Sequence, residues 1–98
     1  MDTEVFRFKK WTNYIFWYQN RCFEIKDTWL HYYWDRDDIG IVIRGSMNLH
    51  NATARIVNSK TLHLSNHNLT YYLKSDSEKD MNEFLHKLQE LGVCITDQ

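Results

Sequence analysis

The chain has 98 residues, of which 43% are hydrophobic and 15% aromatic, and its formal net charge is −1. This length predicts a single domain spanning residues 1–98, and the aromatic content together with the lack of proline excludes a disordered chain. No run approaches the ~18 apolar residues of a membrane-spanning helix, and the first twenty residues do not have the pattern of a secretion signal. We therefore expect a cytoplasmic globular protein in which Cys22 and Cys94 are free thiols.

Seven segments have the composition of short strands. In 4–10, Phe6 and Phe8 alternate with basic residues, which is the period-two pattern of a half-buried strand. In 17–26, Phe23 and Ile25 share one face. Five more strands are expected at 29–34, 43–48, 52–57, 60–65 and 69–74, a spacing typical of a barrel or sandwich. The aromatic residues expected in the core are Trp29, Tyr32, Tyr71 and Tyr72.

An amphipathic helix is expected after the last strand, over about 76–91. Ser75 and Glu78 have the spacing of a capping box, and Gly92 supplies a stop signal. One apolar stripe is formed by Met81, Phe84, Leu85, Leu88 and Leu91. Strands followed by one helix predict an α+β fold, here a seven-stranded antiparallel barrel of two near-orthogonal sheets capped by the C-terminal helix.

No residue pattern suggests an enzyme. His63 and His67 have a metal-like spacing, but no cysteine or carboxylate lies near them in the sequence. Asp35, Asp37 and Asp38 form a carboxylate cluster, but they are expected in a turn, where aspartate is common for conformational reasons. The three glycines stand apart, so there is no phosphate-binding glycine loop. We therefore expect no catalytic residue, no metal and no cofactor.

The stretch KWTNYIFWYQNR, residues 10–21, joins the first two expected strands. Tyr14, Ile15, Phe16 and Trp17 occupy the connection, and connections usually run over the surface. From the residues alone, this apolar cluster could enter a membrane between flanking cations, could dock on a protein partner or could be buried in the core. Base stacking on the aromatic residues is a further possibility, but the near-neutral net charge argues against nucleic acid as a partner.

A family resemblance rests on this stretch and on three others. Lys10-Trp11-Thr12-Asn13-Tyr14 with Arg21 downstream resembles the first hairpin of one subgroup of pleckstrin homology (PH) domains. That subgroup is found in oxysterol-binding proteins, the ceramide transfer protein and the four-phosphate adaptor proteins. Similar spacing is seen for Tyr32-Tyr33, the acidic turn, Arg44-Gly45-Ser46 and Tyr71-Tyr72-Leu73-Lys74, so that the resemblance covers nearly the whole chain.

The resemblance implies a module that binds phosphatidylinositol 4-phosphate. Lys10 and Arg21 match the cations that grip the headgroup, Arg44 matches a further basic residue, and Trp11 matches a tryptophan beside the site. The segment 14–17 matches a membrane-inserting loop. The implied partners are a phosphoinositide-containing membrane and, as a second contact, a small Arf-type GTPase. The implied location is peripheral, on the cytoplasmic side of the Golgi, the trans-Golgi or another secretory-pathway membrane, within a lipid-transfer or adaptor protein.

The sequence also departs from the subgroup's pattern. Phe16-Trp17 stands at the loop tip where Thr-Gly or Lys-Gly is common, and Cys22 and Phe84 stand where tryptophan is usual. Residues 39–43 are apolar where some relatives carry an additional lysine. These departures leave fewer cations around the headgroup. The alternative hypothesis is a PH-fold protein-interaction module with weak or no lipid binding.

Overall fold

The computed structural model describes residues 3–13 and 16–97. The first half of the chain contains β1 (Thr3–Thr12), β2 (Trp17–Lys26), β3 (Trp29–Tyr33), a short 3-10 helix η1 (Arg36–Asp38) and β4 (Gly45–Asn48). The second half contains β5 (Thr53–Asn58), β6 (Thr61–Asn66), β7 (Leu69–Lys74), α1 (Glu78–Glu90) and β8 (Cys94–Asp97). The predicted order of strands followed by a helix is confirmed.

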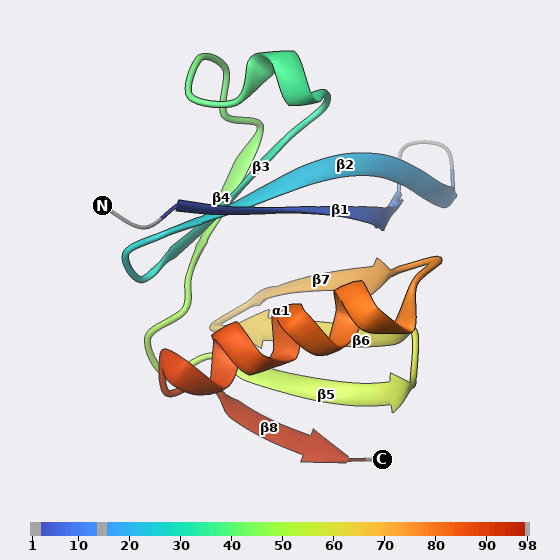
Figure 1. Ribbon diagram of the computed structural model, residues 1–98, viewed down its shortest axis with the longest axis vertical. Coiled ribbons are helices and arrows are strands. Elements are labelled where there is room, and N and C mark those ends of the chain that lie inside the picture. The colour runs from blue at the N-terminus through green and yellow to red at the C-terminus, as the bar shows by residue number, and fades with distance from the viewer. Residues whose placement is uncertain (1–2, 14–15, 98) are drawn as a thin grey trace.

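The strands form one strongly bent sheet in the order β4-β3-β2-β1-β7-β6-β5-β8. Among the described residues, its two halves are joined where Lys9 and Lys10 of β1 pair with Lys74 and Leu73 of β7. Figure 1 shows the halves as an upper and a lower layer, with α1 crossing the lower one. Because this junction is short, β1 diverges from β7. Helix α1 packs against Phe6 and Phe8 of β1.

The core lies between the two halves of the sheet and α1. Phe8 and Phe23 are buried, as their alternation with polar residues predicts, and Phe84 on α1 meets the rings of Phe6 and Phe8 at centroid distances of 5.0 and 4.8 Å. The core prediction also holds for Tyr71, which is buried, and for Tyr32, which packs against the core.

The core prediction is wrong for Trp29 and Tyr72, which are both exposed. Trp29 alternates with the buried Leu30, and Tyr72 alternates with the buried Tyr71 and Leu73, so both rings belong to the outer face of their strands. In an aromatic-rich strand, aromatic character alone does not indicate which face is buried.

The caps of α1 correct one prediction and confirm another. The N-cap is Ser77, whose side chain accepts a hydrogen bond from the Asp80 backbone N–H, so the Ser75–Glu78 capping box is wrong. Ser75 is instead buried and bonds to the backbone of Ser77. The predicted stop at Gly92 is confirmed, because Gly92 has φ +82°, within the left-handed region that ends many helices.

An eighth strand was not predicted, and it is not antiparallel to its neighbour. β8 pairs in parallel with β5, with Ala54 opposite Ile95. β8 covers the outer edge of β5, which would otherwise present unpaired backbone groups. Cys94 at its start is exposed and Cys22 is buried, and both are free thiols as predicted.

Candidate functional site

Lys10 lies in an opening between the two halves of the sheet. We call this opening the mouth; it comprises the cavity lined by Lys10, Tyr32 and Tyr71 and the adjoining side chains of Arg21, Trp34 and Arg44. Its Nζ is 4.9 Å from the ring centre of Tyr32 and 5.2 Å from that of Tyr71, so the ammonium sits between two aromatic walls. Burial lowers the pKa of Lys10 from its usual value, and the nearby charge of Arg21 lowers it further. Lys10, Tyr32 and Tyr71 line a cavity of about 390 Å³.

Arg21 projects from the same face of the sheet as Lys10. It pairs across the strands with Phe8, which points inward, and Lys10 lies two residues further along β1. Its guanidinium is 5.9 Å from the ring centre of Trp34, and that of Arg44 is 3.6 Å from the same ring. Trp34 therefore connects the two arginines, which come from β2 and from the end of the β3–β4 connection.

Gly45 is required where it stands in the Arg-Gly-Ser segment. A Cβ at this position would lie 2.2 Å from a ring carbon of Tyr32, so a side chain would displace that ring. Because Tyr32 forms one wall around Lys10, the glycine contributes to the placement of the ammonium. The backbone N–H of Arg44 donates to the Tyr32 carbonyl, which fixes the chain just before it.

The three cations of the mouth have no carboxylate partner among residues 3–13 and 16–97. The ion pairs of this part of the chain join Lys9 to Asp76, and Lys87 to Glu4 and Glu90. The Arg21 guanidinium instead donates to the carbonyl of Asn20, at 2.7 Å. Lys10, Arg21 and Arg44 can therefore meet an external anion without first breaking an internal salt bridge.

The β1–β2 turn and the first residue of β2 carry exposed apolar side chains beside this mouth; Trp17, expected in the loop, already pairs with Thr12 of β1 as part of β2. Phe16 and Trp17 are 69% and 66% exposed. Tyr14 and Ile15, the other residues of the expected inserting loop, lie outside the described residues. Phe16 adopts φ +52°, a left-handed conformation that favours glycine.

Trp11 is half-buried at the edge of the cavity. Its indole N–H donates to the Asn13 side-chain oxygen at 3.1 Å, and its ring meets Tyr18 edge-on at 5.4 Å. These contacts give Trp11 a packing role on the flank of the mouth. The ammonium of Lys74 approaches the other member of this pair, 4.9 Å from the ring centre of Tyr18.

Three aromatic residues of the mouth were not predicted as site residues. Tyr32 and Tyr71 were expected only to fill the core, and Trp34 was given no role. A signal was available for Trp34, because it lies one residue beyond β3 and two residues after Tyr32, so that continued alternation would point it to the same side as Tyr32. The approach of Arg44 to its ring could not be read from the sequence, since ten residues separate the two.

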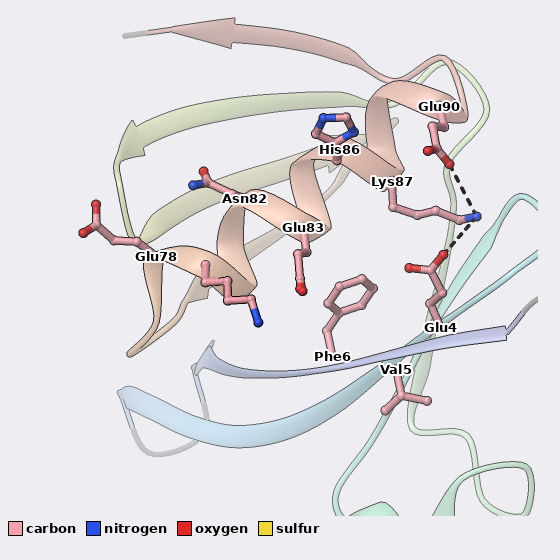
Figure 2. A pocket seen from close by; sticks show the side chains of 10 residues that line it. Glu4, Val5, Phe6, Glu78, Asn82, Glu83, His86, Lys87 and Glu90 are labelled. Atoms are coloured by element: carbon pink, nitrogen blue, oxygen red, sulfur yellow. Dashed lines mark ion pairs between the residues drawn. The ribbon is translucent and has the colours of Figure 1, made fainter.

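A separate groove lies away from these cations. It has a volume of about 870 Å³ and runs between β1 and α1 (Figure 2). Figure 2 shows Phe6 pointing toward the helix, with the Lys87 ion pairs to Glu4 and Glu90 at one end. Four glutamates line it, including Glu78 and Glu83, so it does not suit a phosphate.

The described residues contain no group of three or more His, Cys, Asp or Glu side chains placed to hold a metal ion. No helix among them has the length and hydropathy needed to cross a bilayer.

Comparison with known proteins identifies the fold. No protein-family model matches the sequence. The chain is 32% identical to mouse oxysterol-binding protein 2 over 80 residues, which is 82% of this chain but only 9% of that protein. The PH domain of human oxysterol-binding protein-related protein 11 superposes with a TM-score of 0.78 at 20% identity, covering 91% of this chain and 78% of that one.

A second solved structure is the Slm1 PH domain in complex with inositol-4-phosphate. It superposes with a TM-score of 0.71 at 18% identity, covering 90% of this chain and 94% of that one. The chain therefore has the PH fold, as the resemblance implied.

Proposed function

We propose that this chain is a phosphoinositide-binding module that recognises phosphatidylinositol 4-phosphate in a membrane. The observation that carries the proposal is the mouth itself. Lys10 lines its cavity, and Arg21 and Arg44 meet at the ring of Trp34. None of the three has a carboxylate partner in the described part of the chain, and the side chains of Phe16 and Trp17 nearby are exposed. In this arrangement the cations meet the headgroup phosphates while the two rings enter the acyl boundary.

The chemistry of the mouth suits a monophosphorylated inositol. Such a ring needs only a few charge-assisted hydrogen bonds, which two or three cations can supply. The Slm1 PH domain, which shares this fold, is described in complex with inositol-4-phosphate.

Neither type of contact is sufficient alone. A cation near an anionic surface adds about 1 kcal/mol, and a fully buried large apolar side chain adds roughly 1.5–3 kcal/mol. The two together give stable but reversible attachment. A module of this kind would recruit a larger lipid-transfer or adaptor protein, and the similarity to mouse oxysterol-binding protein 2 supports that context.

We further propose the cytoplasmic face of the Golgi, the trans-Golgi or another secretory-pathway membrane as the location. A small Arf-type GTPase is the proposed second partner. We assign no residue to that contact.

Co-sedimentation with phosphatidylcholine vesicles, with and without phosphatidylinositol 4-phosphate, tests the proposal. The wild-type chain is expected to bind only the vesicles that contain the phosphoinositide. The variant Lys10→Ala/Arg21→Ala is expected to lose this binding, with Lys60→Ala/Lys79→Ala as a control for the loss of two positive charges elsewhere. Equal binding by the two double variants would contradict the proposal.

The loop has its own test. Phe16→Ala/Trp17→Ala is expected to weaken vesicle binding while leaving affinity for the soluble headgroup nearly unchanged, because the rings contact the acyl boundary and not the phosphate. If the wild type binds no anionic vesicle, the exposed loop is better explained as a docking site for a protein, which is the alternative function.

A further inference from the structure

A second group of exposed apolar side chains lies in the connection between β3 and β4. Ile41 and Ile43 are 76% and 50% exposed, and Val42 between them is exposed as well. Single exposed apolar residues are ordinary, but three in succession mark an interaction surface. The sequence pattern showed only that residues 39–43 are apolar, which is equally consistent with burial.

This apolar segment and the β1–β2 loop adjoin the same cavity. It leads through Arg44 into Gly45, which lines the cavity that also holds Lys10. Asn13, where the β1–β2 loop begins, lines that cavity too. The two loops therefore both adjoin the cavity that Lys10 lines.

The backbone holds the segment in an ordered conformation. Asp35 caps η1, and the N–H groups of Ile41 and Val42 both donate to the Asp38 carbonyl, at 2.8 and 3.1 Å. Gly40 makes the turn with φ +79°. The aliphatic side chains are thus presented to solvent by a hydrogen-bonded loop.

The acidic residues of this connection lie apart from its apolar part. Burial raises the pKa of the Cys22 thiol. The nearby charges of Asp35 and Asp38 raise this pKa as well, while those of Arg7 and Arg36 lower it, so all four side chains lie near the thiol. Cys22 alternates with the inward-facing Phe23, so η1 lies over the outer face of β2 and its carboxylates have basic neighbours there. The apolar part continues instead toward Arg44 and Trp34 at the mouth.

We infer that residues 41–43 form a second membrane-inserting loop at the same mouth as Phe16 and Trp17. This inference rests on the proposed function. The occupant is a lipid bilayer, because the segment is followed by Arg44 and Trp34, and an arginine packed on a tryptophan ring is suited to the headgroup layer. Two apolar loops around one phosphate-binding mouth would hold the bilayer at two points and fix the orientation of the domain.

Substitution provides the first test. Ile41→Ser and Ile43→Ser are each expected to weaken binding to phosphatidylcholine vesicles containing phosphatidylinositol 4-phosphate by about tenfold. Affinity for the soluble headgroup and thermal stability should stay at wild-type values. The matched control is Val5→Ser, at a position 42% exposed on β1 and outside the residues that line the mouth, and it should bind these vesicles as the wild type does.

Insertion depth provides the second test. An environment-sensitive nitrobenzoxadiazole label is attached at Ile41→Cys in a Cys94→Ser background, where the remaining Cys22 is buried. On vesicle binding, its emission should shift to the blue and be quenched by lipids brominated in their acyl chains. A label at Val5→Cys should do neither.

The outcomes separate this inference from the proposed function. If the wild type does not bind the phosphoinositide vesicles, the proposed function fails. If it binds, while the serine variants bind equally well and the label stays in water, only the second loop is refuted. If the serine variants lose affinity for the soluble headgroup to the same extent as for vesicles, the loop shapes the cavity and does not insert, which also overturns the inference.

Discussion

The mouth and the α1 end of this domain use similar residues in opposite ways. Around the mouth, Phe16 and Trp17 point outward and the cations have no carboxylate partner among the described residues. At α1, Phe84 is fully buried and Lys87 contacts the carboxylates of Glu4 and Glu90. At the helix, folding itself therefore pairs the charge of Lys87 and buries the ring of Phe84. At the mouth, the cations and exposed rings are left for an external partner that is both anionic and apolar.

The largest expected effect tests whether the buried ring carries stability. Phe84→Ala should destabilise the fold by about 3–5 kcal/mol, because the ring contacts Phe6 and Phe8 and its loss leaves a cavity. Phe16→Ala should change stability by less than ~0.5 kcal/mol. Urea unfolding followed by circular dichroism measures both, and equal losses would mean that the tip of the β1–β2 loop is part of the core.

The next effect tests whether Lys10 serves binding at the expense of stability. Lys10→Met removes the ammonium but keeps an apolar stem against Tyr32 and Tyr71. Headgroup affinity should fall by about 1.5–3 kcal/mol, as for a lost hydrogen bond to a charged group. Stability should rise slightly, because a partly buried charge and its repulsion from Arg21 are removed.

Isothermal titration calorimetry and thermal unfolding of the same Lys10→Met sample check the two signs. A loss of stability together with a loss of affinity would show that Lys10 is a structural residue. Lys60→Met, at an exposed lysine in the turn between β5 and β6, is the control and should change neither quantity.

A smaller effect tests the helix cap. Ser77→Ala should destabilise the fold by about 1 kcal/mol, because the Asp80 N–H loses its acceptor. Ser59→Ala, in an exposed turn, should have no comparable effect. Thermal unfolding of both variants measures the difference. Headgroup affinity should be unchanged in each, since neither serine lines the mouth cavity.

The smallest effect is a pH dependence of binding. The pKa of Lys10 lies below the usual 10.5, so the ammonium is lost earlier than in an ordinary lysine as pH rises. Affinity for the soluble headgroup should therefore decline on the alkaline side below pH 10.5, and Lys10→Arg should remove this decline. The stability of the free protein should instead rise with pH over the same range, because the folded state binds fewer protons at Lys10 than the unfolded state does.

Much of the fold could be predicted because local patterns agree with it. The alternation around Phe6 and Phe8 predicted an inward face, and β2 begins and ends where predicted. The helix cap was ambiguous, since Ser75 and Ser77 are each followed three residues later by an acid, and only burial of Ser75 distinguishes them. β8 was missed because four residues gain strand structure from a partner some forty positions away.

The site was predictable only in part, for a related reason. The positions of Lys10 and Arg21 on one face follow from strand alternation and register. The sharing of Trp34 by Arg21 and Arg44 depends on the path of the β3–β4 connection, which no local pattern encodes. The exposure of Ile41 and Ile43 depends on the same path.

The left-handed backbone of Phe16 has a consequence for how attachment would begin. A phenylalanine at φ +52° costs on the order of 1 kcal/mol relative to glycine, so Phe16→Gly should relax the hairpin while removing its apolar tip. With the phenylalanine in place, the ring is already directed outward before any bilayer is met. Less conformational entropy then remains to be lost at the moment of contact, and attachment should be limited by encounter with the membrane and not by rearrangement of the loop.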